Sequence, residues 1–294
     1  MPSSHFPHSA WPFPLLGGLR GALGALAAIL LALSLPIAAQ TQADSPPVHT
    51  VERTWLWGAG RANVLDTYLT PQDYTGPDLL IDHRTERAAR WDKNRWGKGR
   101  WQVAAHYTAH LAYLSSPTDD GREWDTELTA AAALAREWKL SPRFSLMAGP
   151  QLEASGGGTY NTRNGNNPAQ GRFGLQLQAM ARADYRFPLF GRQAQARLLC
   201  ELPLVGAQFA PQYGQSYYEI FSLGHTSGII HFTHPANVPS LRLQATATLP
   251  ILGSGLTLGY MADIRQSRLS SLKRHAWRHA FVLGFTRTIQ WQTR

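Results

Sequence analysis

The residues His225-Thr226-Ser227-Gly228 place a possible nucleophile close to a possible base. A serine hydroxyl attacks a carbonyl only after a base within hydrogen-bond reach has taken its proton, and histidine is the commonest such base. Asn237 follows ten residues after Ser227. A serine hydrolase is therefore one interpretation of the chain, although His and Ser two positions apart are common by chance.

Three further groups of residues have the types that chemistry needs. His231 and His234, in the same segment, could ligate a transition metal, but no cysteine or well-spaced carboxylate accompanies them. Asp125 and Glu127 could form a glycosidase-like pair, but arginines nearby favour salt bridges. The glycines at 156–158 lack the Gly-Lys-Ser/Thr that completes a phosphate-binding loop. We therefore expect no metal site and no cofactor.

The segments that must position these residues have a two-residue periodicity. Between Phe173 and Phe187 every odd position is apolar, while most even positions are polar or small. A period of two puts these sets on opposite faces of a strand of about fifteen residues, whereas an average globular strand has about five or six. The pattern recurs along the chain, and repeated two-faced segments separated by turn residues are typical of a transmembrane β-barrel.

Ten strands are expected, an even number as in single-chain bacterial barrels. Their expected ranges are 49–62, 78–90, 99–114, 123–136, 142–155, 171–187, 194–206, 238–250, 254–266 and 274–291. Short connections, expected on the periplasmic side, are at 92–98, 139–142, 190–193 and 253–255. Longer, extracellular ones are expected at 66–77, 156–171 and 206–237. The fold class is therefore an all-β, antiparallel, up-and-down barrel with long extracellular loops.

Charge placement separates this barrel from a soluble one. Lysine is nearly absent from the expected strands, and their polar face mixes arginine with acids, as at Arg182 and Asp184. A barrel of about eight strands is filled by side chains, and water-filled channels appear at sixteen to eighteen. Ten strands therefore indicate a packed polar lumen with no general pore, and a narrow conduit for a small solute is a further alternative.

The N-terminal region predicts export. Residues 21–39 are uncharged and mostly apolar, and they end in Ile37-Ala38-Ala39, a small-residue cleavage pattern. The stretch is also long enough for a transmembrane helix, but Pro36 and the alanines favour a cleaved signal peptide at 1–39. A short leader at 40–47 then precedes a barrel domain at 48–294.

Net charge and the single cysteine set further limits. The net charge is +9, or +8 from residue 40 onward, because residues 1–39 contain one arginine and no acid. No basic helix accompanies this charge, so nucleic acid is not an expected partner. The single cysteine, Cys200, excludes an internal disulfide, and its parity predicts a lipid-facing position.

The expected external segments contain the most distinctive sequences of the chain, which are 64–69, 161–169 and 209–224. They resemble the Gram-negative family called domain of unknown function 3316 (DUF3316), over about Val51 to Trp291. The resemblance implies an exported barrel in the cell outer membrane, and it brings no known activity or catalytic residue. Outer-membrane lipids and the barrel assembly machinery are the partners that such a protein would meet.

Two functions follow for the external segments. One is binding or envelope support without catalysis, in which an aromatic surface contacts a glycan, a lipid or a partner protein. Its candidate residues are Tyr160, Tyr213, Tyr217, Tyr218 and Glu219. The aromatic segment could instead fold back over the barrel mouth, with tyrosine hydroxyls and Glu219 bonded to lumen residues.

The other function is catalytic. His225, Ser227 and Asn237 resemble the arrangement of outer-membrane phospholipase A, in which histidine activates serine and asparagine orients the histidine. That resemblance would add calcium as a cofactor. The spacing to Asn237 is shorter than this family leads us to expect, and the rest of the chain shows no such likeness.

Overall fold

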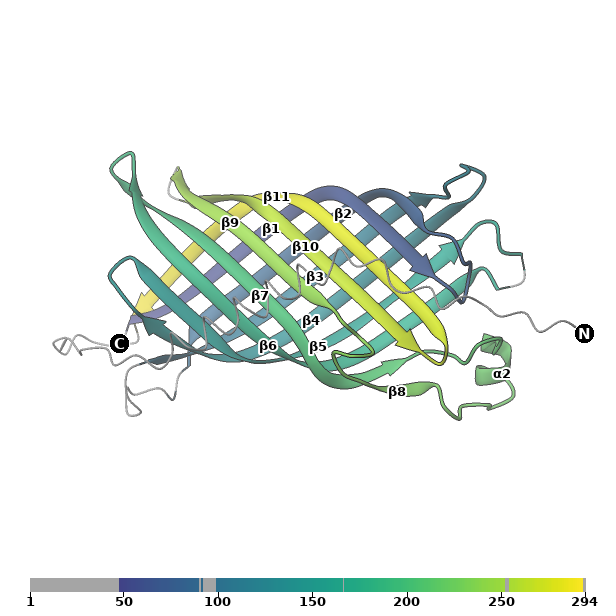
Figure 1. The fold of residues 1–294 in the computed structure, drawn as a ribbon. Helices are drawn as coiled ribbons and strands as arrows, with labels where there is room; N and C mark the ends of the chain where they lie inside the picture. Colours follow the sequence, from purple (N-terminus) through teal and green to yellow (C-terminus); the bar gives the residue numbers. More distant parts are fainter. Residues whose placement is uncertain (1–47, 90, 92–98, 166, 252–253, 293–294) are drawn as a thin grey trace, which may run out of the picture. The chain divides into compact units, whose positions relative to one another are not determined.

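The protein is a closed β-barrel of ten long antiparallel strands (Figure 1). The computed structural model describes residues 48–292, except 90, 92–98, 166 and 252–253, so the expected signal peptide and leader lie outside the described residues. The barrel strands are β1 (Val48–Asp66), β2 (Tyr74–Ala88), β3 (Arg100–Ser115), β4 (Arg122–Lys139), β5 (Phe144–Asn161), β6 (Ala169–Leu189), β7 (Arg192–Phe209), β9 (Leu241–Ile251), β10 (Ser254–Leu269) and β11 (Leu272–Gln292). All ten expected strands are confirmed.

Hydrogen bonding between sequence neighbours builds the wall, and two pairings complete it. β1 pairs with β11, which closes the barrel, and β7 pairs with β9. The segment between β7 and β9 contains a five-residue helix, α2 (Tyr217–Phe221), and a short strand, β8 (Ile230–Thr233). None of the described helices is long and apolar enough to cross a membrane.

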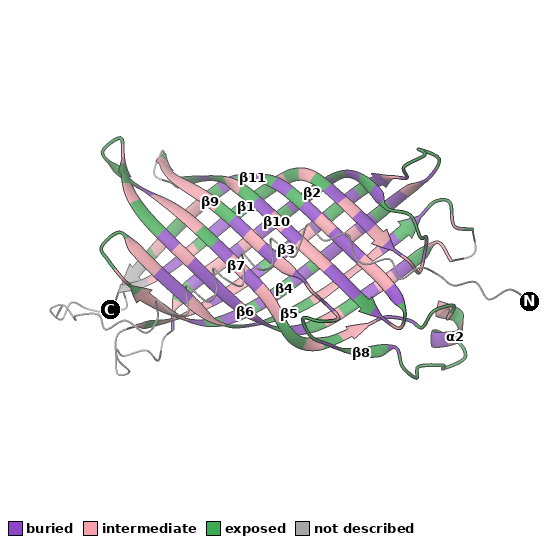
Figure 2. Cartoon of the chain, viewed as in Figure 1, coloured by how far each residue is buried: buried purple, intermediate pink, exposed green. Residues whose placement is uncertain are grey.

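Side-chain alternation sorts the residues as the sequence predicts (Figure 2). In β6 the even-numbered Arg172, Gln178 and Arg182 are buried in the lumen, while Leu175 and Leu177 are exposed on the outer face. A closed barrel leaves no unpaired strand edge, so its backbone groups are bonded within the wall. The apolar outer face and the polar lumen therefore suit a membrane-spanning barrel.

The two ends of the barrel differ. We call the end with connections 67–73, 116–121, 162–168, 210–240 and 270–271 the loop end, and the other the turn end. The connection expected at 156–171 is shorter than predicted, because Gly156, Gly157 and Gly158 lie within β5. A Cβ on Gly157 would lie 2.2 Å from the carbonyl oxygen of Thr126 on β4. Glycine here allows close approach of two strands and forms no phosphate-binding loop.

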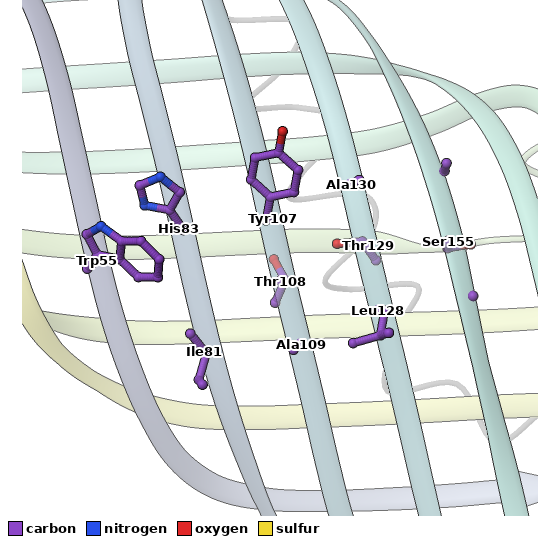
Figure 3. Close-up of a pocket in the computed structure, with 12 residues that line it drawn as sticks. Trp55, Ile81, His83, Tyr107, Thr108, Ala109, Leu128, Thr129, Ala130 and Ser155 are labelled. Carbon is purple, nitrogen blue, oxygen red and sulfur yellow. The ribbon is translucent and has the colours of Figure 1, made fainter.

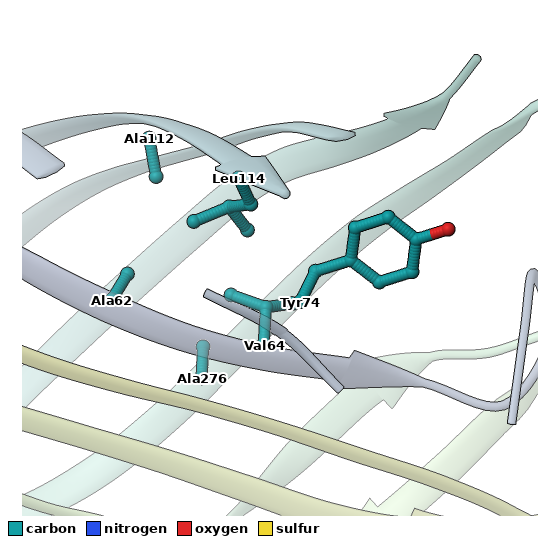
Figure 4. Packing of buried hydrophobic residues seen from close by; sticks show 6 residues of the cluster. All are labelled: Ala62, Val64, Tyr74, Ala112, Leu114 and Ala276. Carbon is teal, nitrogen blue, oxygen red and sulfur yellow. The ribbon is translucent and has the colours of Figure 1, made fainter. Parts of the chain in front are cut away.

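Apolar side chains fill parts of the lumen. Near the loop end, Val64, Tyr74 and Leu114 pack together with Ala62, Ala112 and Ala276 (Figure 4). Closer to the turn end, a second cluster contains Met147, Met180 and Leu199 with three alanines. The lumen is thus a packed core with apolar and charged layers.

Candidate functional site

A network of buried ion pairs occupies the lumen from its middle toward the loop end. Asp125 on β4 is fully buried, accepts hydrogen bonds from Arg172 at 2.7 Å and Thr159 at 2.5 Å, and contacts Arg278. Arg265 lies 3.0 Å from Glu153 and 3.8 Å from Glu127. The carboxylates of Asp125 and Glu127 are therefore held by arginines.

We call this set the central network. Its members are linked by contacts of 4.0 Å or less, and they are the carboxylates Asp66, Asp78, Asp82, Asp125, Glu127, Glu153, Glu201 and Asp263, the arginines Arg84, Arg172, Arg242, Arg265, Arg274 and Arg278, and the imidazoles His106 and His110. Eight acids thus face six arginines and two histidines. A buried charge is costly unless it is paired. Each carboxylate and each arginine of this network has a group of opposite charge or an imidazole within 4.0 Å.

A smaller network of buried ion pairs lies closer to the turn end of the barrel, and we call it the turn-end network. Arg182 contacts Glu86 and lies 2.7 Å from Asp184, while Arg197 bridges Asp184 at 2.7 Å and Glu52 at 2.8 Å. Two cavities lined by lumen residues have volumes of about 10 and 30 Å³. A cavity must hold about one probe sphere, 10–15 Å³, to accept a water molecule, so these two have room for little more than water. The described lumen residues fit a rigid polar core better than a conduit.

The loop between β7 and β9 is folded and attached to the barrel rim. The Tyr217 hydroxyl donates to Gln170 at 2.9 Å and accepts from the Gly171 N–H at 2.6 Å. The Tyr68 hydroxyl, from the β1–β2 loop, donates to the Gln215 carbonyl at 3.0 Å. Burial raises the pKa of Tyr68 to about 12. The aromatic segment is therefore tied to the loop end through the Tyr217 hydroxyl and the Gln215 carbonyl.

A capping box organises α2. The Ser216 N–H donates to the Glu219 carboxylate at 2.7 Å, and the Glu219 N–H donates to the Ser216 hydroxyl at 3.2 Å. The hydrogen bond from the Ser216 backbone lowers the pKa of Glu219. Glu219 caps its own helix, and among the described residues it is bonded to no lumen residue, contrary to the fold-back expectation for this side chain.

The second half of the loop extends the barrel wall (Figure 1). β8 pairs with the end of β7, from Gly206 to Phe209. Asn237 then closes a turn: its Oδ1 accepts from the His234 N–H at 2.8 Å, its Nδ2 donates to the Phe232 carbonyl at 2.9 Å, and its own carbonyl accepts from the Arg268 N–H at 2.8 Å. The loop is thus anchored to β6, β7 and β10.

The structure does not assemble the three candidate hydrolase residues. His225 and Ser227 are both exposed, and Asn237 is committed to backbone groups. Within the described chain, no hydrogen bond joins the side chains of these three residues. The His225 N–H instead donates to the Glu219 carbonyl at 2.9 Å.

The other loop histidines are also bound to the backbone. His231 Nε2 donates to the Ala210 carbonyl at 3.1 Å, and His234 Nδ1 accepts from the Ala236 N–H at 3.2 Å. Among the described residues no group of three or more His, Cys, Asp or Glu side chains is arranged to hold a metal ion.

The candidate ligand-binding tyrosines divide into two kinds. Tyr213 and Tyr218 are exposed at the loop end, and Tyr160 is half exposed on the outer face of β5. Tyr217 is half-buried and serves the attachment described above. Only the first three have surface free for a ligand in the described structure.

Sequence reasoning missed an apolar surface beside these tyrosines. Phe173, Phe209 and Ile230 are direct cross-strand partners on β6, β7 and β8, and Phe232 lies on the next row. Phe221 on α2 stacks on Tyr217, with ring centroids 6.0 Å apart. We call Phe173, Phe209, Phe221, Ile230 and Phe232 the loop-end apolar surface. The alternation of Ile230, His231 and Phe232 was a local signal for β8, but four residues are too few to be distinctive.

The chain matches one family model and several solved structures. The model described as protein of unknown function (DUF3316) matches residues 26–292. No curated protein matches the chain significantly. The chain is similar to the outer membrane protease OmpT from Escherichia coli, with 8% identity, a TM-score of 0.42, and 85% of this chain and 99% of that chain covered. It is also similar to the transport unit of the autotransporter AIDA-I from Escherichia coli, with 10% identity, a TM-score of 0.37, and coverage of 89% and 97%. The translocator domain of the autotransporter NalP from Neisseria meningitidis is similar as well, with 9% identity, a TM-score of 0.35, and 91% of this chain and 95% of that chain covered. These identities are too low to transfer a function.

Proposed function

This chain belongs to the DUF3316 family of proteins of unknown function, and we propose that it is an outer-membrane barrel that binds a ligand or partner at its loop end. In this proposal it works neither as a pore nor as an enzyme. The β7–β9 loop presents the binding surface, and the rigid lumen holds that surface in place.

The outer face supports the membrane location. Large apolar side chains are exposed on it around the barrel, including Leu79, Leu128, Leu177, Leu198 and Phe281. Soluble monomers rarely expose contiguous apolar patches larger than a few hundred Å². Lipid is the solvent that suits such a surface.

One observation carries the binding proposal. The loop-end apolar surface leaves Phe221 75% and Phe232 66% exposed, although the same loop is held by hydrogen bonds at both of its attachments. A folded loop that keeps aromatic side chains exposed has a surface available for a partner, and Tyr213 and Tyr218 of the same loop are exposed as well.

A photo-crosslinking experiment tests this proposal. We replace Tyr218 or Tyr213 with p-benzoylphenylalanine in cells and compare Phe190, which is 95% exposed at the turn end, as the control position. A defined adduct is expected from the loop-end positions and not from Phe190. The absence of adducts at both tyrosines contradicts the binding proposal.

A conductance measurement separates binding from transport. Purified protein in a planar bilayer is expected to show no single-channel steps, because ion pairs fill the lumen. A variant lacking residues 212–235, checked for folding by the mobility difference between boiled and unboiled samples, is expected to behave in the same way. Single-channel current steps in either protein favour a conduit for a small solute. Steps seen only in the shortened variant identify the β7–β9 loop as a lid on that conduit.

A further inference from the structure

The outer face contains a second candidate site, which begins at arginines near the turn end and continues along the middle of the wall. We propose that it binds one glycerophospholipid of the inner leaflet, with the phosphate at Arg53, Arg87 and Arg287 and an acyl chain in a furrow beside Trp55 and Tyr107. The proposal requires a membrane-embedded barrel, and its test is separate from that of binding at Tyr213 and Tyr218.

An aromatic ridge borders the furrow (Figure 3). Trp55, His83 and Tyr107 are direct cross-strand partners on β1, β2 and β3. The Trp55 and His83 rings stack with centroids 3.9 Å apart, and the His83 and Tyr107 rings are near parallel at 6.3 Å. His83 Nδ1 donates to the Thr54 carbonyl at 3.0 Å, and its Nε2 lies 3.1 Å from the Thr85 hydroxyl. Both imidazole nitrogens are thus occupied, which fixes the ridge.

The furrow itself is floored by small residues. It has a volume of about 570 Å³ and is lined on β3, β4 and β5 by Ala109, Ala130, Ala154 and Gly156, among others. A neighbouring groove of about 820 Å³ shares Ile81, Ala109, Leu128 and Gly156 with it and continues to Leu79 and Phe173. The two form one apolar channel open to lipid along the wall, a shape that suits a methylene chain.

Three arginines lie on the turn-end side of the ridge. Arg53 on β1 is the direct partner of Arg287 on β11, and Arg87 on β2 pairs with Val51, two residues from Arg53. All three side chains are exposed, and among the described residues none of them has a carboxylate partner. Like charges directly opposite each other destabilise a sheet unless an anion lies between them.

The chemistry of this cluster selects a phosphate. Guanidinium groups bind phosphate oxygens through paired, charge-assisted hydrogen bonds. Arg53 and Trp55 are successive same-face residues of β1, so a headgroup at the arginines places its glycerol beside the indole and its chains at the furrow. An anion that carries an apolar tail therefore satisfies both halves of the site, whereas free phosphate satisfies only one.

Native mass spectrometry of the detergent-purified full barrel, titrated with phosphatidylglycerol, tests the proposal. We expect one retained lipid per barrel. Arg53→Gln combined with Arg287→Gln is expected to weaken binding at least about tenfold, because two charge-assisted contacts are lost. Arg143→Gln removes an exposed arginine of the same end outside the cluster, and it is expected to leave affinity unchanged.

A second pair of variants tests the furrow. Ala130→Trp fills it, whereas Ala179→Trp adds the same indole to the outer face of β6, away from the furrow. Only the first is expected to weaken binding, and unchanged heat-dependent mobility confirms that each variant folds.

Equal binding by all variants overturns the proposal, as does equally tight binding of uncharged diacylglycerol. Competition by inorganic phosphate alone assigns the arginines to a free anion and also overturns it. If the parent barrel retains no lipid while crosslinking at Tyr218 persists, this inference is refuted and the proposed function is unaffected.

Discussion

Arg84 on β2 donates a hydrogen bond of 2.7 Å to Glu201 on β7, although the two strands are five places apart around a ten-stranded barrel. The pair therefore spans the lumen. Both side chains are almost completely buried, and Glu201 is also 3.1 Å from Arg242. Side chains from opposite walls thus hold each other, which explains how a membrane barrel of this size has a solid core.

Breaking this pair is predicted to destabilise the barrel strongly. Arg84→Met removes one of the positive charges that compensate the buried Glu201 carboxylate. Removing one partner of a buried ion pair costs about 3–5 kcal/mol. Urea titration of the protein in lipid vesicles measures this loss in the free energy of unfolding. The exposed pair Arg163–Asp120, at 2.6 Å, is the matched control: Arg163→Gln is expected to cost about 0–1 kcal/mol. Equal losses in both variants contradict a packed, water-poor lumen.

The sequence predicted the wall of this molecule and not its interior. Alternation is a local property, so Leu175, Leu177 and Gln178 could be assigned to faces without any partner being known. The pairing of Arg84 with Glu201 depends on strand order and on register summed around the whole barrel, so sequence composition predicted only that arginines and acids would meet. A binding surface built from Phe173, Phe209 and Ile230 needed the same register, across three strands.

Glycine misled the sequence reading of β5 for a physical reason. A glycine run is a strong loop signal, but Gly157 lies within the strand because β4 passes too close to it for a side chain. α2 and β8 were too short to give a periodic signal. The glycine run, α2 and β8 all lie at the loop end, where the candidate binding surface is. The fold was therefore more predictable than the function.

The face assignment makes a simple prediction on β6. Leu177 is 41% exposed on the outer face near the middle of the strand, so Leu177→Arg places a charge in hydrocarbon at a cost of about 2–4 kcal/mol. Leu177→Phe keeps the position apolar and is expected to change the free energy of unfolding by much less. The same urea titration in vesicles compares the two. An arginine tolerated as well as phenylalanine places this part of β6 in water.

Close packing of β4 on β5 predicts a difference between adjacent glycines. Gly157→Ala puts a Cβ 2.2 Å from the Thr126 carbonyl, which forces the strands apart and is expected to cost about 1–3 kcal/mol. A Cβ on Gly156 has its nearest neighbour, in the Phe173 ring, at 3.4 Å, so Gly156→Ala is the control. Folded fraction after refolding, measured from the heat-dependent mobility, should fall for the first variant alone.

The α2 capping box predicts pH dependence at the loop end. Because the folded pKa of Glu219 is lowered, its contribution to loop stability is present above the ordinary value of 4.5 and is lost as the pH falls through the folded pKa. Hydrogen–deuterium exchange of amides 216–225, corrected for the intrinsic rate, should therefore accelerate below about pH 4.5. Glu219→Gln keeps a neutral acceptor at the same position, and its exchange should not show this transition.

Catalysis by His225 and Ser227 is predicted to be absent. The two side chains are exposed and unbonded to each other, and Asn237, which would have to orient the histidine, is bonded to the Phe232 and His234 backbone. Purified protein in mixed micelles is expected to release no fatty acid from phospholipid, with or without added calcium. Ser227→Ala and His225→Ala are expected to match the parent protein in this assay and in heat-dependent mobility, since neither side chain is buried. Fatty-acid release that disappears in Ser227→Ala while the mobility shift remains would establish a hydrolase whose residues come together only on lipid, and it would replace the binding function proposed for the loop.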